Sequence, residues 1–239
     1  MLRENREFVR WASERLTVVA AVWLAAGLAF SVFVVWAFLE LTDEVLEGES
    51  RAFDRAVLLW IHDTSPGWFD GPMRLVTALG YYYVVVPLLA VAALVFYWKG
   101  WRLSAVLLVV STGGSIVLTT VLKGVIQRTR PELFDSGYQA SFYSFPSGHA
   151  TVALGFYGML TVMLAYRSRG AGRWAVAAGG VLVLLLIGFS RLYLGVHFPT
   201  DILAGYLSAL LWLVCVGGVY ALWLPVRGLR SVKSGRNAG

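Results

Sequence analysis

Two histidines and an aspartate lie in short polar segments between long apolar stretches of the chain. His149 follows Pro146-Ser147-Gly148, and Asp201 follows His197 by four residues. A carboxylate that accepts a hydrogen bond from one imidazole nitrogen fixes the tautomer and makes the other nitrogen more basic, so that it can attack an electrophile. A helical turn would bring His197 and Asp201 together, although Pro199 disturbs that geometry. One histidine can therefore be a nucleophile while the other protonates a leaving group.

Three cationic residues accompany these histidines. Lys123 and Arg130 are seven residues apart, or two helical turns, so both side chains point one way if a helix continues through them. Arg191 precedes His197 by six residues. Taken alone, each cation is explained more simply by a side chain that reaches the membrane interface from a helix end. The combination of three cations with two histidines favours a site for an anion.

The segment 146–149 is the predicted start of a helix, with Pro146 in its first turn. Free backbone N–H groups at such a start form a site for anions. Gly148 lets a phosphate approach the backbone closely, and the Ser147 hydroxyl can donate to a phosphate oxygen. Considered alone, the segment is explained equally well as a plain helix start with an interfacial histidine at His149.

Together these residues suit phosphoryl transfer, in which catalysis consists mostly of positioning the phosphoryl group and neutralising charge on its oxygens. The sequence has no group of Cys, His and carboxylate residues at the spacing of a metal site. We therefore expect a reaction that needs no metal and no other cofactor, because the cations supply the electrostatic effect of a metal.

The composition indicates that the elements carrying these residues belong to a membrane protein. Of the 239 residues, 58% are hydrophobic and 14% are charged, whereas an average soluble domain has about 25% charged residues. This shortage of charge argues against a soluble globular protein and against a disordered chain. A disulfide scaffold is excluded because Cys215 is the only cysteine in the sequence.

Six stretches are apolar enough to cross a membrane as helices of about 20 residues, some of them only roughly. They predict an all-α polytopic membrane protein, with a kink at Pro87 in the second span. Phe53, Val57, Trp60 and Ile61 have helical spacing and predict a short amphipathic extracytoplasmic helix on the membrane surface, although a helix that only covers the bundle fits equally well. The six stretches are residues 16–39, 75–98, 103–122, 150–166, 174–189 and 202–226.

The distribution of charge orients the chain. With six spans both termini lie on one side, which carries 13 basic and 3 acidic residues, while the other side carries 7 basic and 11 acidic residues. Cytoplasmic loops are enriched in Lys and Arg, so we expect a multi-pass protein of the cell membrane with cytoplasmic termini and an extracytoplasmic active site. The net charge of +6 then reports topology rather than nucleic-acid binding. Residues 227–239 are predicted to form a disordered basic cytoplasmic tail.

Three motifs, in this order along the chain, resemble the signature of the type 2 phosphatidic acid phosphatase family, whose relatives include vanadium haloperoxidases and glucose-6-phosphatase. The resemblance extends from about residue 53 to the sixth predicted span, and no signature residue departs from the pattern. It implies a single six-helix membrane phosphatase domain over residues 1–226, with the signature at residues 123–201. The motifs are Lys123-x6-Arg130-Pro131, Pro146-Ser147-Gly148-His149 and Ser190-Arg191-x-Tyr193-x-Gly195-x-His197-x3-Asp201.

The resemblance also implies roles by position. His197 would attack phosphorus and form a phosphohistidine, Asp201 would orient and activate His197, and His149 would protonate the leaving group and later activate water. Arg128 would contact a second phosphate or the lipid headgroups, and Tyr193 would serve packing. The residues implied to hold the phosphate are Lys123, Arg130, Ser147, Gly148 and Arg191.

The implied function is that of an integral membrane lipid phosphatase acting on undecaprenyl pyrophosphate, phosphatidylglycerophosphate, phosphatidic acid or lipid A phosphates. The expected partners are the lipid phosphate substrate and membrane lipids, with no nucleic acid and no obligate protein partner. A transporter or channel for a lipid or an anion is one alternative. A haloperoxidase-like enzyme that holds vanadate in the same pocket is another. Phosphate release that is lost on replacing His197 would distinguish the phosphatase from a transporter.

Overall fold

The computed structural model describes the backbone of residues 2–236 and the side chains of residues 25–218. Every regular element within residues 2–236 is a helix, which confirms the expected all-α class. The elements are α1 (Leu2–Glu47), α2 (Arg51–Thr64), η1 (Gly67–Phe69), α3 (Asp70–Ala78), α4 (Tyr82–Trp98), α5 (Arg102–Ile126), α6 (Gly148–Ala153), the π-helical turn η2 (Leu154–Gly158), α7 (Met159–Arg167), α8 (Ala171–Tyr193) and α9 (Pro199–Arg236).

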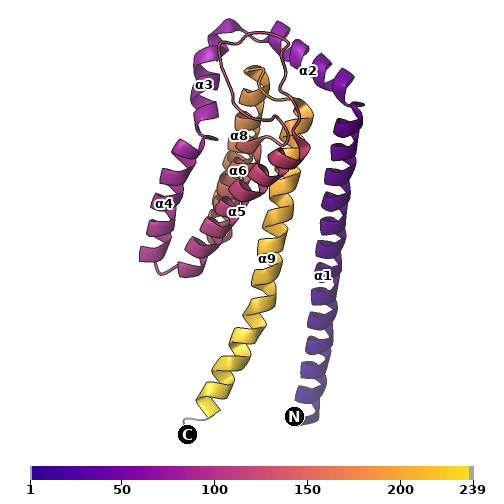
Figure 1. The fold of residues 1–239 in the computed structure, drawn as a ribbon. Helices are drawn as coiled ribbons and strands as arrows, with labels where there is room; N and C mark the ends of the chain where they lie inside the picture. The colour runs from indigo at the N-terminus through magenta and orange to yellow at the C-terminus, as the bar shows by residue number, and fades with distance from the viewer. Residues whose placement is uncertain (1, 237–239) are drawn as a thin grey trace.

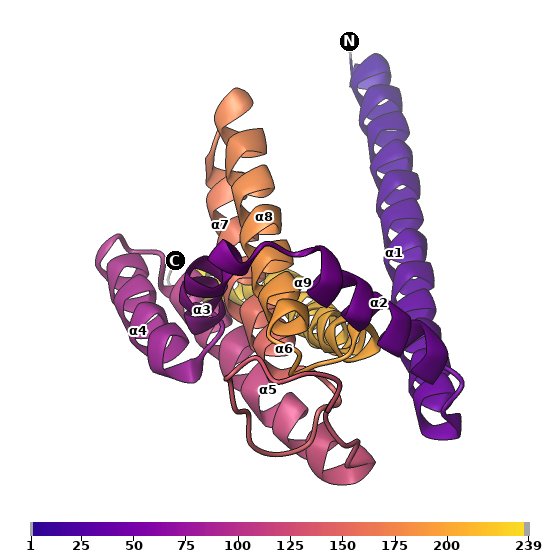
Figure 2. The same cartoon turned by 90° about the horizontal axis from the view of Figure 1, so that it is seen from above.

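The helices form a bundle with one end open to polar loops. Figure 1 shows α5, α6, α8 and α9 at the centre, with α4 beside α5 and α1 beside α9. The beginning of α1 and the end of α9 lie at the same end of the molecule, whereas α2, α3 and the loop 127–147 lie at the other. Seen from above, α2 lies across that second end (Figure 2). The loops that carry the predicted motifs therefore gather at the end opposite the two terminal helix ends.

Five of the described helices are long and apolar enough to cross a membrane, and six crossings result if η1, α3 and α4 form one bent span. The sequence predicts the bend at Pro87, but Pro87 lies inside α4 and the 48° break falls at residues 79–81. The chain packs closely against α6 at this break. A Cβ on Gly80 would lie 2.8 Å from Cδ2 of His149, a distance that real Cβ contacts essentially never show.

The fourth predicted span contains an irregularity that the sequence does not indicate. The helix from Gly148 to Arg167 passes through a π-helical turn at Leu154–Gly158. There the Gly155 carbonyl accepts a hydrogen bond from the Ser111 hydroxyl of α5 at 2.9 Å. A Cβ on Gly155 would lie 2.2 Å from Oγ of Ser115, so this glycine permits the close approach of the two helices that frame the site.

Several helices are longer than predicted. The acidic residues that follow the first predicted span, up to Glu47, belong to α1, which ends before Gly48 with φ +82. The fifth span extends to Ala171–Tyr193. The backbone of α9 continues to Arg236, so the helix runs into residues 227–239, and the predicted disorder of this tail stays a prediction. The side chains there, and residues 237–239, lie outside the described part of the chain.

The predicted amphipathic helix corresponds to α2, but its faces differ from the prediction. The sequence groups Phe53, Trp60 and Ile61 on one apolar face, whereas in the structure Phe53 and Trp60 are exposed and Ile61 is buried. The buried positions are Asp54, Leu58 and Ile61, at a helical spacing of four and three. The helix is thus rotated so that the Asp54 carboxylate enters the bundle, where Arg128 binds it.

Candidate active site

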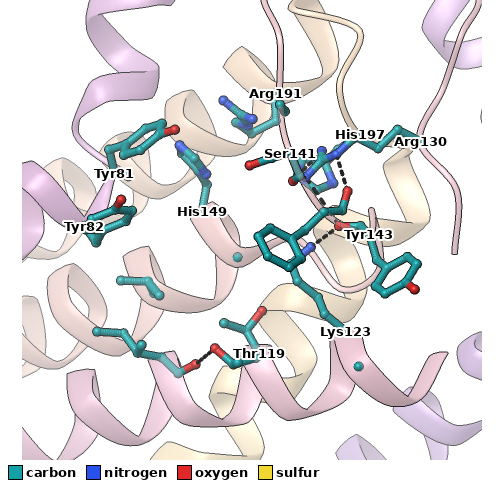
Figure 3. A pocket seen from close by; sticks show the side chains of 18 of the residues that line it. Tyr81, Tyr82, Thr119, Lys123, Arg130, Ser141, Tyr143, His149, Arg191 and His197 are labelled. Carbon is teal, nitrogen blue, oxygen red and sulfur yellow. Dashed lines mark hydrogen bonds between the residues drawn. The ribbon is translucent and has the colours of Figure 1, made fainter. Parts of the chain in front are cut away.

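A cavity of about 610 Å³ lies where the predicted motifs meet (Figure 3). Its walls come from the α3–α4 junction, α5, the loop 127–147, α6, the end of α8 and the loop before α9. Asp201 and Ser147 lie behind the wall, and both are fully buried. Of the residues predicted from the sequence, those that line the cavity are Lys123, Arg130, Gly148, His149, Arg191 and His197.

His197 and Asp201 form a hydrogen-bonded pair. Nδ1 of His197 lies 3.3 Å from Oδ2 of Asp201, and the Phe198 N–H donates to the same oxygen at 2.8 Å. Pro199 does not disturb this arrangement, because it is the first residue of α9 and its missing N–H is not needed there. The Asp201 carboxylate thus lies in the first helical turn, directly against the histidine that precedes the helix.

The tautomer of His197 follows from its neighbours. Arg130 Nη1 lies 3.2 Å from Nε2 of His197, and a guanidinium can only donate hydrogen bonds. Nε2 must therefore accept, which leaves the proton on Nδ1 facing Asp201. The unprotonated nitrogen is therefore Nε2, whose lone pair faces Nη1 of Arg130 in the empty cavity.

The cations Lys123 and Arg130 reach the cavity from different kinds of structure. Lys123 lies in the last turn of α5, whereas this helix ends at Ile126 and Gln127 has φ 51. The helix therefore does not continue to Arg130, the condition for a shared helical face, and Arg130 reaches the cavity from the loop that follows. Arg130 Nη1 donates to the Val196 carbonyl at 2.6 Å, which joins this loop to the segment between α8 and α9.

Both cations also bind the loop above them. Lys123 Nζ donates to the carbonyl of Tyr143 at 2.5 Å and to that of Ser144 at 3.2 Å. Arg130 donates to the carbonyls of Ser141 and Phe142, each at 2.8 Å. The carbonyl oxygens of residues 141–144 thus occupy positions that the oxygens of an anionic ligand could take.

Arg191 is the most deeply placed cation, with 1% of its surface exposed. Its Nη1 donates to the Thr77 hydroxyl at 2.7 Å and to the Tyr138 hydroxyl at 3.3 Å. Its guanidinium carbon lies 5.1 Å from the centre of the Tyr138 ring. Within residues 25–218 no acidic side chain pairs with Arg191, so its charge is available to an anion in the cavity.

Three buried polar atoms around the cavity have no hydrogen-bond partner among the described residues. They are Nε2 of His149, Nε of Arg191 and Oγ1 of Thr119. His149 is held edge-on against the ring of Tyr81, with ring centres 5.0 Å apart, and Figure 3 shows it across the cavity from His197. A buried polar atom without a partner is costly. These atoms therefore mark where a polar ligand would complete the site.

Ser147 and Gly148 form the start of α6. Oγ of Ser147 accepts from the Ala150 N–H, and the backbone N–H of Ser147 donates to the Asp201 carbonyl at 2.9 Å. A Cβ on Gly148 would meet only ordinary contacts, the shortest being 3.7 Å to Thr119. Protein packing therefore does not require glycine here, and the bare backbone faces the cavity instead.

Burial and positive charge shape the titration of the site. The pKa of His197 lies well below 6.5, because the ring is buried and because Arg191, Arg130 and Lys123 repel a further positive charge. Burial and Arg191 lower the pKa of Arg130 to about 10, so this residue remains charged at neutral pH. The site thus combines a neutral imidazole at His197 with a charged guanidinium at Arg130.

We expect the low pKa of His197 to be measurable by NMR. A variant with His62 and His149 replaced by glutamine contains His197 as the only histidine. Because a lowered pKa keeps the ring neutral, ring-¹³C-labelled histidine should titrate with a midpoint well below 6.5 in the folded protein. The denaturant-unfolded chain is the control and should titrate near 6.5. A midpoint at or above 6.5 in the folded protein would contradict the account of this site.

Some residues at the site were missed or misinterpreted from the sequence. Arg128 binds Asp54 and Asp201 at 2.7 and 2.6 Å rather than facing phosphates or headgroups. Tyr193 donates a hydrogen bond to Asp70, in addition to packing. The sequence did not indicate Thr119 and Tyr81 as site residues, because a threonine in an apolar helix and a tyrosine near a span end are ordinary membrane features.

Comparison with known proteins agrees with this geometry. The family model described as PAP2 superfamily matches residues 104–223, and the chain belongs to this family. It is 34% identical to phosphatidylglycerophosphatase B of Bacillus subtilis over 157 residues, which cover 63% of this chain and 75% of that protein. It is also 34% identical to undecaprenyl-diphosphatase of Sulfolobus acidocaldarius over 143 residues, covering 58% and 64% of the two chains.

A solved structure extends the likeness to the fold. The crystal structure of a transmembrane PAP2-type phosphatidylglycerolphosphate phosphatase from Bacillus subtilis superposes with a TM-score of 0.74 and 27% identity. The superposition covers 80% of this chain and 96% of that one. Together with the apolar helices, this likeness identifies a multi-pass membrane protein with the PAP2 fold.

Proposed function

We propose that this protein is an integral membrane lipid phosphatase that hydrolyses lipid phosphates or pyrophosphates through a phosphohistidine. The observation that carries the proposal is the cavity itself, which His149 and His197 line together with Lys123, Arg130 and Arg191. The membership of the PAP2 superfamily and the activities named for its relatives support the same reading.

The first half of the reaction forms a bond to His197. Nε2 attacks phosphorus with its lone pair as the bond from phosphorus to the leaving oxygen breaks. His149 gives a proton to that oxygen, so the lipid alcohol, or the lipid monophosphate from a diphosphate, leaves neutralised by one proton. Asp201 accepts the Nδ1–H of His197 and stabilises the positive charge that develops on the ring.

The second half releases phosphate. His149, now without its proton, takes a proton from water as the water oxygen attacks phosphorus, and the bond between phosphorus and Nε2 breaks. The same cations hold the phosphoryl oxygens in both steps, namely Lys123, Arg130 and Arg191, and the Gly148 N–H adds a neutral donor. The oxygen of the Ser147 hydroxyl caps α6. Because Ser147 lies behind the cavity wall, its contact with a phosphate oxygen stays a prediction.

For the membrane arrangement we propose six spans, with the bent α3–α4 pair counted as one. The termini are cytoplasmic and the cavity faces the extracytoplasmic side, as the charge distribution indicates. On that side α2 lies along the membrane surface, and its exposed Phe53 and Trp60 are suited to the interface.

The substrate class follows from the walls of the cavity. Next to the histidines lie cations, whereas the wall formed by α4 and α5 carries Tyr82, Val86 and Ile116. A molecule with a phosphate joined to a hydrocarbon chain matches both parts. Phosphatidylglycerophosphate, undecaprenyl pyrophosphate and phosphatidic acid all fit this description.

Phosphate release from purified protein in liposomes tests the proposal. We expect hydrolysis of at least one lipid in a panel of phosphatidylglycerophosphate, undecaprenyl pyrophosphate, phosphatidic acid and lipid A phosphates, ranked by kcat/KM. Transport of a lipid or anion across the liposome without phosphate release would instead support a transporter. Oxidation of halide only after addition of vanadate would support a haloperoxidase.

We expect activity to survive metal removal. Among the described residues, no three His, Cys, Asp or Glu side chains come together as metal ligands, and in the proposed mechanism the protein's cations stabilise the phosphoryl charge. The rate of phosphate release should therefore change by less than about twofold after dialysis against EDTA. A complete loss that a divalent cation restores would contradict the mechanism. The control is a metal-dependent phosphatase, which should lose its activity in the same buffer.

A further inference from the structure

The catalytic pair His197–Asp201 is joined to a second buried carboxylate. Asp54 of α2 is fully buried, although it lies 74 residues before Arg128 and outside residues 104–223 matched by the family model. Arg128 donates through Nη2 to Asp54 at 2.7 Å and through Nη1 to Asp201 at 2.6 Å. One guanidinium thus bridges two carboxylates, of which one accepts from His197.

Asp54 also holds the helix start that carries Asp201. Its Oδ1 accepts from the Thr200 N–H at 3.1 Å, and its Oδ2 accepts from the Thr200 hydroxyl at 2.7 Å. Arg128 Nη1 in turn donates to the Thr200 hydroxyl oxygen at 2.8 Å. The guanidinium carbon lies 4.4 Å from the centre of the Phe198 ring, which fixes its plane. The residues from 198 to 201 therefore all contact, or are next in sequence to residues that contact, the cluster formed by Asp54, Arg128 and Asp201.

The charges in this cluster have a consequence for the histidine. A guanidinium paired with Asp201 alone would neutralise that carboxylate and weaken its pull on the Nδ1–H. Asp54 shares the guanidinium, so two buried carboxylates face one partly exposed cation and Asp201 keeps more negative charge for His197. None of these three residues lines the cavity, and the phosphate-binding cations do not contact Asp54.

From this arrangement we propose that Asp54 is a positioning residue for catalysis, which acts through Arg128 on Asp201 and so on the nucleophile His197. The inference rests on the proposed phosphatase function. It assigns α2 a part in the reaction, since α2 supplies the carboxylate that balances the charge of Arg128.

Asp54→Asn is the variant that tests the proposal, because asparagine keeps the size of the side chain and removes its charge. With a short-chain phosphatidic acid in detergent micelles, we expect kcat to fall about 10- to 100-fold, the range for residues that orient a catalytic group. KM should stay within about twofold, because the phosphate cradle is untouched. Asp70→Asn is the matched control, since Asp70 is an exposed acid of α3 whose hydrogen bond from Tyr193 lies outside this cluster.

A double-variant cycle separates positioning from a general loss of structure. If Asp54 acts through Asp201, adding Asp54→Asn to Asp201→Asn should lower kcat by less than about twofold further. Equal losses in both backgrounds, an unchanged kcat, or a rise in KM alone would overturn the proposal. Arg128→Lys keeps the charge but cannot bridge two carboxylates, so it should reproduce the loss of kcat even if Asp54→Asn fails to fold. Full activity of Arg128→Lys would overturn the proposal as well.

The wild-type protein in the same assay distinguishes the two levels of inference. If it releases no phosphate from any lipid of the panel, the proposed function fails. If it is active while Asp54→Asn matches it, only the role of Asp54 fails.

Discussion

Replacing His197 with alanine should lower kcat for lipid phosphate hydrolysis on the order of 10⁴-fold or more, the scale seen when an enzyme loses its nucleophile. The side chain is 1% exposed and lines the cavity, and the other histidine there, His149, has the separate role of the acid. The measurement is phosphate release from phosphatidic acid or undecaprenyl pyrophosphate in liposomes. Substrate binding should persist, because Lys123, Arg130 and Arg191 remain.

His62→Ala is the matched control for this variant. His62 is exposed on α2 and stacks on Phe134 with ring centres 4.0 Å apart, outside the residues that line the cavity. Its removal should change kcat by less than about threefold. Substantial turnover by the His197→Ala variant would show that a different group attacks phosphorus.

Replacing His149 with alanine should separate two substrates by the quality of their leaving groups. Hydrolysis of a lipid phosphate, whose alkoxide needs a proton, should slow about 10²- to 10⁴-fold. An aryl phosphate with an acidic phenol leaves without a proton, so phosphorylation of His197 should continue while the attack of water is slow. Stopped-flow measurement should therefore show a burst of phenolate equal to the enzyme concentration.

The same burst assay checks the assignment of roles. Wild-type protein should show steady turnover, and His197→Ala should show neither burst nor turnover. A burst from His197→Ala and none from His149→Ala would reverse the two histidines. Equal losses on both substrates for His149→Ala would show that His149 does not act as the acid.

Short-range geometry made part of the site predictable. His197 and Asp201 are four residues apart, so a single turn at the start of α9 brings them together. The apolar lengths predicted most spans in the same way, because a helix across hydrocarbon needs a run of apolar residues whatever its neighbours are. Accordingly, six of the residues predicted from the three motifs line the cavity.

Other features of the site depend on packing between residues far apart in the sequence, and the local sequence pattern could not indicate them. Arg130 reaches the cavity through a loop after α5 ends, and not through the helical register that its spacing suggested. The bend of the second span falls beside Gly80, where His149 packs, and not at Pro87. The face of α2 that carries Asp54 is buried, and Arg128 binds the Asp54 carboxylate there. The local sequence pattern of α2 does not indicate this distant partner.

The central claim is that phosphate passes through Nε2 of His197, and rapid quenching tests it most directly. The His149→Ala variant, mixed with a ³²P-labelled aryl phosphate and denatured in alkali, should retain label that is stable to base and released by acid. Mass spectrometry should place this label on the peptide that contains His197, and His197→Ala should retain none. Label on another residue, or phosphate release by active wild-type protein with no label in either protein, would contradict the account.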